Sequence, residues 1–441
     1  MEIGVLLNSI WVFLKESYLY IYEYIPADII YQIFNTAFYF FLTIMMLISA
    51  IYFVLTIYNI FLKNKDKEKE FDIKKAPFVT IQIPTYNELV ALRCAKKCLE
   101  FDYPKDKYEI IVGDDSNKPE ISKEIDDFAN ENNIKVTRRG SNIGYKAGNL
   151  NHMLKYSKGE VIVIFDSDFI PEKDFLKKII TPFIYDKKIA GVQARWKFIN
   201  TNQNIISILG ATIVAVFHQV VLPFMKKNNI SMLCGSAEAV KKKILIKLGG
   251  WKHGSLTEDI EYSLRLLNNG YKIKYLEKLE CAGEVPYTAK DLYKQQMRWA
   301  YGVCHAFKEH GKDIFFNKNI NYKEKFCIFV QASGYFFSTF LLFIFLTGFL
   351  SFIFHPPGPI DFGKFFIETA RNILTTTGLL IAGAYSLYKI NQKKTIFKAI
   401  ASSLSYGLIV VYYVNKGIFK VFLNRPMQWH MLNKVGNKSV N

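Results

Sequence analysis

Long, mainly apolar runs lie towards both ends of this chain, and short ones fill the middle. Residues 36–62 carry no charge and are long enough to cross a hydrocarbon core of about 30 Å with some tilt. Further apolar runs lie at 326–354, 365–390 and 399–423. The pattern predicts membrane segments within residues 1–62 and again after a central region.

An earlier apolar run, residues 3–25, is interrupted by Lys15, Glu16 and Glu23. It predicts a short span or an interfacial helix, and an uncleaved one because no small-residue cleavage site precedes a soluble stretch. The clearer span is followed by a basic linker, residues 63–76, which opens with "KNKDKEKE". Lysines beside a membrane helix are typical of its cytoplasmic side. We therefore expect the residues after the linker to lie in the cytoplasm.

In the middle of the chain, short apolar runs alternate with charged, helix-like stretches. The runs "FVTIQI", "YEIIVG", "NIKVTRR", "VIVIFD" and "AGVQARW" are typical of strands. Their alternation with helices predicts an α/β, Rossmann-like domain with a mostly parallel sheet at residues 77–310. Ligands of open sheets gather at the carboxyl ends of the strands, so the residues after each run are the candidates for a binding site.

Acidic residues follow two of these strands. Asp166 and Asp168, in "DSD", have a spacing that can direct both carboxylates at one divalent cation bridging to a substrate diphosphate. Taken alone, such a pair is more often the start of a solvated turn. Asp114 and Asp115 also end a strand, in "DDSN", and one of them suits a base or ribose.

The stretch "GYKAGNLN", residues 144–151, combines glycines with a cation. Gly144 and Gly148 permit close approach of the backbone to a ligand, and Lys146 suits a diphosphate. An isolated lysine would more often be a surface charge.

The tripeptide "TED", residues 257–259, opens a predicted helix that stops at Gly270. Thr257 suits the N-cap, and acidic residues suit the positive end of the helix dipole. Capping alone would therefore explain the stretch. Asp259 is also a candidate general base, provided that it lies within hydrogen-bond reach of an acceptor hydroxyl.

The stretch "QQMRWAYG", residues 295–302, places Gln295 and Arg298 on one helix face. Arg298 offers a planar donor fork for phosphate, and Trp299 offers a flat apolar face on which a sugar ring can stack. The same residues also suit a helix lying on the membrane, with Arg and Trp as interface anchors.

The formal charge of +18, from 57 Lys and Arg against 39 Asp and Glu, fits nucleic acid, an anionic membrane face or a phosphate-bearing substrate. The excess lies beside apolar runs and no recognition motif accompanies it, so we expect no nucleic-acid partner. The 6 cysteines form no C-x-x-C pair, which predicts free thiols in a reducing compartment.

Taken in order, these stretches resemble a membrane-embedded family-2 glycosyltransferase of the type that includes cellulose, β-mannan and hyaluronan synthases. The resemblance covers about residues 77–302 and rests on motifs in the family's order: "PTYNE", "DDSN", "YKAGNLN", "DSD", "VQARWKFIN", "CGSAEAV", "GGW", "LTEDIEYSLRL" and "QQMRWAYG". The wording from "VQARW" onward, with "GEVP" at 283–286, is most similar to cellulose-synthase-like β-mannan and β-glucan synthases. It implies a GT-A fold and a nucleotide-diphosphate sugar donor, either a UDP-sugar or GDP-mannose.

The resemblance also implies roles for individual residues. Asp259 would be the catalytic base of an inverting transfer that leaves a β linkage, without a covalent intermediate. Asp166 and Asp168 would bind Mg²⁺ or Mn²⁺. The implied substrate-binding residues are Thr85, Glu88, Asp114, Asp115, Lys146, Asp166, Cys234, Gly235, Glu258, Gln295, Arg298 and Trp299.

By the same resemblance, the protein would be a multi-pass cell-membrane enzyme with a cytoplasmic catalytic domain, extending a polysaccharide and exporting it. Transfer of a single sugar to a membrane lipid explains the same motifs, and product length separates the two. A third hypothesis, a non-catalytic membrane scaffold, is disfavoured because every expected acid and Arg298 are retained. Four or five spans are few for exporting a polymer, which favours a second copy of the chain or an accessory subunit as partner.

The tail, residues 425–441, departs from the family pattern. Many relatives carry an aromatic residue and then Arg-Thr-Pro-Lys in a segment that closes over the donor, whereas this tail reads "QWHMLNK", with Trp429 and Lys434 retained. Three full spans within residues 323–424 would place the tail outside, away from a cytoplasmic domain. Either one of those spans is interfacial or re-entrant, or the tail is not a gate.

Overall fold

The computed structural model describes residues 26–61, 69–355 and 361–434. The predicted helix at 3–25 and the start of the linker lie outside the described residues. The chain forms two compact units, whose described residues fall within Met1–Ile51 and Phe336–Gly378 for the first, and within Tyr52–Tyr335 and Leu379–Asn441 for the second. The domain boundaries expected from the sequence stay predictions.

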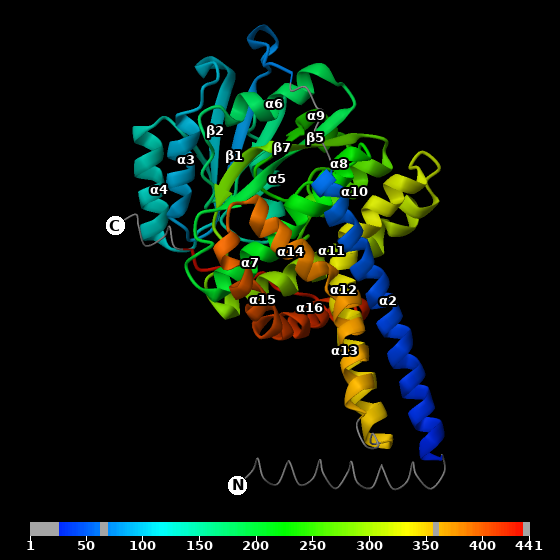
Figure 1. Cartoon of the computed structure of the whole chain (residues 1–441). Coiled ribbons are helices and arrows are strands. Elements are labelled where there is room, and N and C mark those ends of the chain that lie inside the picture. Colours follow the sequence, from blue (N-terminus) through cyan, green and yellow to red (C-terminus); the bar gives the residue numbers. More distant parts are fainter. Residues whose placement is uncertain (1–25, 62–68, 356–360, 435–441) are drawn as a thin grey trace, which may run out of the picture. The chain divides into compact units, whose positions relative to one another are not determined.

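A seven-stranded sheet forms the centre of the second unit, and Figure 1 shows it with helices packed around it. The order of its strands is β3-β2-β1-β4-β6-β5-β7. Its strands are β1 (Val79–Thr85), β2 (Tyr108–Asp114), β3 (Lys135–Thr137), β4 (Val161–Ile164), β5 (Ile189–Phe198), β6 (Glu238–Lys241) and β7 (Lys272–Gly283). Neighbouring strands run parallel, except that β6 is antiparallel to both β4 and β5. The prediction of a mostly parallel α/β sheet is confirmed.

The strands β1 to β5 are those predicted from the sequence, whereas β6 and β7 were not predicted. β6 is only 4 residues long. β7 forms an edge of the sheet, and its sequence "KIKYLEKLECAG" alternates buried positions with more exposed ones that carry lysine or glutamate. An edge strand with one buried face contains charges that hide its strand character from a search for apolar runs.

Helices cover both faces of the sheet. The first face is covered by α3 (Val90–Leu99), α4 (Pro119–Glu131) and α6 (Phe175–Tyr185). The second face is covered by α5 (Tyr145–Leu154), α9 (Lys242–Lys247) and α10 (Glu258–Asn268). This three-layer arrangement leaves the carboxyl ends of the parallel strands free to form a site.

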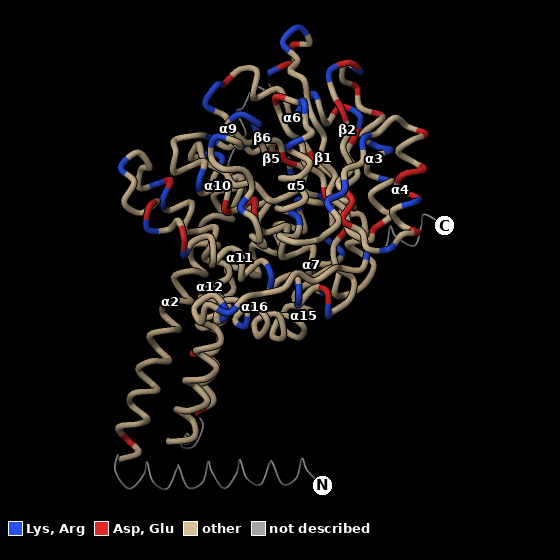
Figure 2. Tube along the Cα trace, turned by 180° about the vertical axis from the view of Figure 1, so that it is seen from behind, with Lys and Arg blue, Asp and Glu red and all other residues tan. Residues whose placement is uncertain are grey.

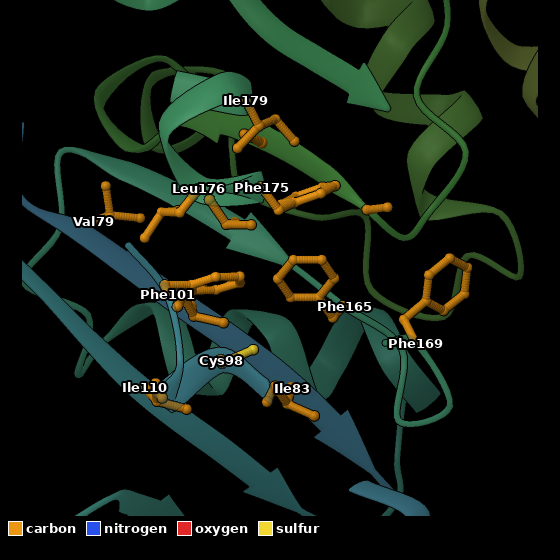
Figure 3. Close-up of a cluster of buried hydrophobic side chains, with 14 of the residues drawn as sticks. Val79, Ile83, Cys98, Phe101, Ile110, Phe165, Phe169, Phe175, Leu176 and Ile179 are labelled. Carbon is orange, nitrogen blue, oxygen red and sulfur yellow. The ribbon is translucent and has the colours of Figure 1, made fainter. Parts of the chain in front are cut away.

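The two faces of the sheet belong to two hydrophobic cores. Ile83 of β1 lies in the first core, where Figure 3 shows it with Phe101 and Phe165. Ile162 and Ile164 of β4 lie in the second. Because successive side chains of a strand point to opposite faces and both faces are buried, the central strands are continuous apolar runs. That continuity is what made them predictable.

A long apolar helical segment, residues 205–227, also belongs to the second unit. It consists of α7 (Ile205–Val216), the π-helix η3 (Phe217–Val221) and α8 (Leu222–Lys227). The segment is long and apolar enough to cross a membrane, but 83% of its most apolar window is buried inside the protein. Ile208 packs against Leu387 and Ala399. The segment is therefore part of the packed interior, and it was not predicted from the sequence.

The predicted "QQMRWAYG" helix is α11 (Ala289–Phe316). α16 (Tyr406–Phe422) packs against it so closely that a Cβ added at Gly417 would lie 2.5 Å from the carbonyl oxygen of Met297. α15 (Ile396–Leu404) precedes α16, and the segment ending in α15 is bent by 56° from α16, which makes the pair a broken span or a re-entrant loop.

Two further helices among the described residues are long and apolar enough to cross a membrane: α2 (Ala27–Phe61) and α12 (Tyr322–Phe354). Figure 2 shows few charged residues along either of them. In the first unit, Phe41 of α2 stacks on Phe343 of α12 with their ring centroids 4.9 Å apart. The apolar runs predicted at these places are thus helical, as expected for membrane association.

The apolar run at 365–390 differs from the expectation of a full span. It forms two helices, α13 (Phe362–Thr376) and α14 (Gly378–Lys389), rather than one. α13 carries Glu368 and Arg371 on successive turns. Charged side chains are costly in hydrocarbon, so this sequence favours a shorter helix at an interface over a continuous span.

Candidate active site

One pocket lies at the carboxyl ends of the parallel strands and gathers the predicted site residues. Its lining includes Thr85, Glu88, Asp115, Lys146, Asp166, Asp168, Cys234, Gly235, Glu258, Asp259, Gln295, Arg298 and Trp299. These residues come from strand ends, from the first turns of α5 and α10, and from α11. Asp114 does not line the pocket.

Asp114 and Asp115 point to different partners. Asp114 accepts hydrogen bonds from Ser122 Oγ at 2.7 Å and Arg138 Nε at 2.8 Å. Burial opposes its charge, but hydrogen bonds from Ser116 and Ser122 lower the pKa of Asp114 below its usual value. Asp114 thereby ties β2 to α4 and the end of β3, which is a structural task.

Asp115 faces the pocket and is paired with Arg139, a residue that the sequence analysis missed. Arg139 Nε lies 2.9 Å from Asp115 Oδ1, and Nη2 lies 2.5 Å from Oδ2. Burial raises the pKa of Asp115 despite this cation. Nothing in "NIKVTRR" distinguishes Arg139 from the adjacent Arg138, so only the fold reveals that it aligns Asp115.

Lys146 lies at the centre of a half-buried group of charges. Its Nζ is 2.7 Å from Asp166 Oδ1, 3.2 Å from Glu258 Oε1 and 2.5 Å from the carbonyl oxygen of Gly235. Burial alone would favour the neutral amine, but Asp166 and Glu258 raise the pKa of Lys146. The pocket therefore holds a permanent cation at the end of β4.

Asp168 is bound from two sides. Its Oδ1 lies 2.7 Å from Lys434 Nζ, and its Oδ2 accepts a hydrogen bond from the backbone N–H of Glu284 at 2.9 Å. Burial opposes its charge, but Lys434 lowers the pKa of Asp168. Glu284 belongs to the "GEVP" motif, which therefore lies beside the pocket because its backbone binds Asp168.

The pair Asp166 and Asp168 fits a divalent ion. Both carboxylates line the pocket, and both now contact a lysine ammonium, so each faces a position that favours positive charge. Among the described residues, no group of three or more His, Cys, Asp or Glu side chains is arranged to hold a metal. Oxygen ligands from a bound diphosphate would complete such a site, as is usual for Mg²⁺.

Asp259 lies in the first turn of α10 and is buried. Its Oδ2 is 3.4 Å from the position that a Cβ on Gly235 would occupy. Burial, reinforced by the adjacent charge of Glu258, raises the pKa of Asp259 to about 7. Thr257 is the N-cap residue, but its side chain makes no capping hydrogen bond. Helix capping by the threonine hydroxyl therefore does not explain the motif.

The segment from Cys234 to Ala237 lies opposite Asp259 and is fixed by a carboxylate. Glu238 Oε2 accepts the backbone N–H of Cys234 at 3.1 Å and that of Gly235 at 2.7 Å. Gly235 has a φ of +86°, a conformation that glycine adopts without a steric cost. This role of Glu238 was not predicted from the sequence.

On α11, Gln295, Arg298 and Trp299 all face the pocket. Arg298 Nη1 donates to the carbonyl oxygen of Leu256 at 3.0 Å, and burial lowers the pKa of Arg298. These contacts place the motif inside the protein, against the segment that leads into α10. They disfavour the alternative in which it only anchors a helix on a membrane surface.

The tail also lines the pocket, through Trp429, His430, Leu432, Asn433 and Lys434. The tail therefore lies on the same side as the sheet's carboxyl edge. Of the two alternatives left by the sequence, the structure favours the one in which the intervening segments are not all full spans.

The part of the chain that forms this pocket is similar to known glycosyltransferases. Residues 80–249 match the family described as "Glycosyl transferase family 2". The chain carries a family-2 glycosyltransferase domain. Glucomannan 4-beta-mannosyltransferase 2 of Arabidopsis thaliana is 30% identical over 341 residues, which is 72% of this chain and 63% of the relative. Glucomannan 4-beta-mannosyltransferase 9 of the same plant is 30% identical over 307 residues, 64% of this chain and 57% of the relative.

The chain thus spans less than two thirds of the length of these two relatives. Among solved structures, the mannosyltransferase PcManGT from Pyrobaculum calidifontis, in complex with GDP-Man and Mn²⁺, is similar with a TM-score of 0.56 and 18% identity. The likeness covers 86% of this chain and 99% of that one. It confirms the GT-A type of fold for the family-2 domain. The resemblance to cellulose-synthase-like mannan synthases is confirmed as well.

Proposed function

We propose that this protein is an inverting glycosyltransferase that moves a hexose from a nucleotide-diphosphate sugar to the end of a growing β-linked polysaccharide. The observation that carries the proposal is the position of Asp259. It is a buried carboxyl in the pocket of a family-2 domain, across from Gly235 and close to the charges around Lys146. A base, a cationic site and a stacking platform in one pocket are what an inverting transfer requires.

We further propose mannose as the sugar and GDP-mannose as the donor. The sequence relatives are named 4-beta-mannosyltransferases, and the solved structure with the same fold holds GDP-Man and Mn²⁺. In this proposal the nucleotide lies over Thr85, Glu88 and Asp115, because these residues line the pocket at the ends of β1 and β2. Asp114 would not contact the nucleotide; it holds Ser122 and Arg138 in place instead.

In the transfer itself, Asp259 takes the proton of the acceptor hydroxyl as its oxygen attacks the anomeric carbon. The bond from that carbon to the diphosphate oxygen breaks, and inversion turns an α-linked donor into a β-linked product. Lys146 and Arg298 place positive charge where the diphosphate develops negative charge. Asp166 and Asp168 would hold Mg²⁺ or Mn²⁺, which would neutralise the departing diphosphate.

The acceptor would lie between Trp299 and the segment around Cys234 and Gly235, with Gln295 at its side. An indole face suits the apolar face of a sugar ring. Membrane lipids around α2 and α12, and a second copy or accessory subunit for export, stay predictions, as does the cytoplasmic location of the domain.

The test offers GDP-mannose, UDP-glucose and UDP-N-acetylglucosamine, each radiolabelled, to the full chain in lipid nanodiscs with Mn²⁺. Asp259→Asn is the inactive variant, and Asp127→Asn, an exposed residue of α4, is its matched control. We expect a polymer from GDP-mannose with wild type and control, and none with Asp259→Asn. A short product in the organic phase would favour the lipid acceptor, and no incorporation from any donor would refute the proposal.

A further inference from the structure

The described part of the tail, residues 425–434, makes several hydrogen bonds to one buried carboxylate, which belongs to Asp291. Asp291 lies in the first turn of α11 and is only 1% exposed. Its Oδ1 lies 3.0 Å from His430 Nε2, and its Oδ2 accepts Asn433 Nδ2 at 2.8 Å and Asn433 N–H at 3.3 Å. Thr288 Oγ1 supplies a further hydrogen bond to Oδ2 at 2.7 Å.

Most of the hydrogen bonds to Asp291 therefore come from the tail. A buried carboxylate is costly unless its oxygens are hydrogen-bonded. If the tail left, Asp291 would keep only the bond from Thr288 among these partners. The Asp291 carboxylate thus stabilises the bound position of the tail. Asp291 itself does not line the pocket.

The residue after Asn433 is Lys434, whose ammonium reaches the acidic edge of the site. Its Nζ lies 2.7 Å from Asp168 Oδ1, 3.0 Å from Glu88 Oε2 and 2.7 Å from Ser167 Oγ. The Lys434 side chain is 15% exposed. The tail thereby supplies the cation that neutralises Asp168. A divalent ion at this site would also need a carboxylate oxygen of Asp168 as a ligand.

We propose that Asp291 is a positioning residue that docks the tail and holds Lys434 as the internal counter-ion of Asp168, in competition with a divalent cation. The inference rests on the proposed function only in taking Asp168 as a metal ligand. Two cations on one carboxylate repel each other, so occupancy by either one weakens the other by the same factor. The diphosphate of a bound donor adds negative charge, which favours the divalent cation and the Lys434 ammonium together. The metal therefore binds together with the donor rather than ahead of it.

The first test measures Mn²⁺ binding without nucleotide, from the electron paramagnetic resonance signal of free Mn²⁺, with the full chain in nanodiscs. Lys434→Ala removes the competing cation, and Asp291→Asn loosens the tail while keeping side-chain size. We expect both to tighten Mn²⁺ binding, Lys434→Ala by about tenfold, within the usual range of coupling between ligands. Arg425→Ala, which removes an exposed cation of the same tail, is the matched control and should leave binding unchanged.

The direction of the change separates positioning from a merely structural role, because a damaged pocket would bind Mn²⁺ more weakly. Unchanged or weaker Mn²⁺ binding in Lys434→Ala would overturn the competition. Tighter binding in Lys434→Ala but not in Asp291→Asn would overturn the role of Asp291. Neither measurement involves sugar transfer, so the tail proposal and the proposed function fail independently.

A second test follows the tail directly, by trypsin cleavage after Lys434, whose side chain is 15% exposed, in the absence of ligand. Release of the tail exposes this bond, and we expect Asp291→Asn to be cleaved several-fold faster than wild type at an unchanged melting temperature. Equal cleavage rates would contradict docking by Asp291.

Discussion

Asp259 illustrates how single side chains set the chemistry. Its carboxyl is held between the like charge of Glu258 and the cation of Lys146, in a buried place. Burial disfavours ionisation, whereas a base must be ionised to accept a proton. The balance of these effects gives the Asp259 carboxyl a pKa of about 7, and a general base is most effective when its pKa lies near the working pH.

The pH dependence of kcat/KM follows from this. Because the pKa of Asp259 is raised to about 7, the carboxyl is protonated and inactive below that pH and ionised above it. We expect kcat/KM to rise with pH through about 7 and then to level off. Asp259→Asn should lose activity by about 10²- to 10⁴-fold, the usual contribution of a general base. A profile that is flat from pH 5 to 9, measured at saturating Mn²⁺, would exclude this assignment.

Glu238 allows a second prediction at the scale of residues. Its carboxylate accepts the N–H groups of Cys234 and Gly235. Glu238→Ala leaves the N–H of Gly235 without this partner, whereas the N–H of Cys234 keeps its hydrogen bond to Gln193 Oε1 at 2.7 Å. A buried group left unsatisfied costs about 1–3 kcal/mol. We expect a lower melting temperature and a higher KM for the acceptor. Glu238→Gln keeps a carbonyl acceptor and should be milder in both measurements; equal behaviour of the two variants would contradict the account.

Among the elements, the contact between α10 and α11 decides where the base lies. Gly302 of α11 packs directly on the side chain of Thr257, the residue before α10, so that a Cβ there would overlap it. A shift of α10 would carry Asp259 with it. Small-to-large changes in packed positions cost about 1–3 kcal/mol.

We therefore expect Gly302→Ala to lower both the melting temperature and kcat. Gly311→Ala on the same helix is the matched control, because its nearest neighbour lies 3.9 Å away. An alanine there should stabilise the helix by up to about 1 kcal/mol and leave kcat unchanged. If both variants behave alike, the packing of Gly302 does not position the base.

Elements also show where sequence reasoning reaches its limit. The central strands and the residues after them were predictable, since burial on both faces makes continuous apolar runs and strand ends bring Asp115 and Asp166 together. β7 was hidden by its charged half, and Arg139 by its neighbour Arg138. The tail contacts of Asp291 join residues that are 139 and 142 positions apart, and no local pattern reports such a pairing.

Along the whole chain, apolar helices precede and follow a family-2 domain whose pocket includes the tail. The described residues contain two long apolar helices, α2 and α12. Within the protein, 39% of the most apolar 18-residue stretch of α2 is buried, and 6% of that of α12, whereas the share is 83% for residues 205–227. Exposed apolar surface of this extent indicates contact with lipid. The buried segment, by contrast, needs no membrane.

We expect the chain to stay with membranes after an alkaline carbonate wash and to need detergent for extraction. Cysteine substitutions make the distinction between helices testable. A cysteine at the exposed Phe349 of α12 should react with a lipid-soluble maleimide, whereas one at the buried Leu209 of α7 should not. Release by carbonate, or equal labelling, would contradict membrane association through α12.

The central claim is inverting transfer with Asp259 as the base. The most direct measurement is the anomeric configuration of the newly formed linkage, read from the one-bond C1–H1 coupling by NMR, after reaction of the wild type and of Asp259→Asn with ¹³C-labelled GDP-mannose. The account predicts β linkages from the α-linked donor with the wild type and no product with Asp259→Asn. An α-linked product, or a β-linked product formed equally well by Asp259→Asn, would contradict it.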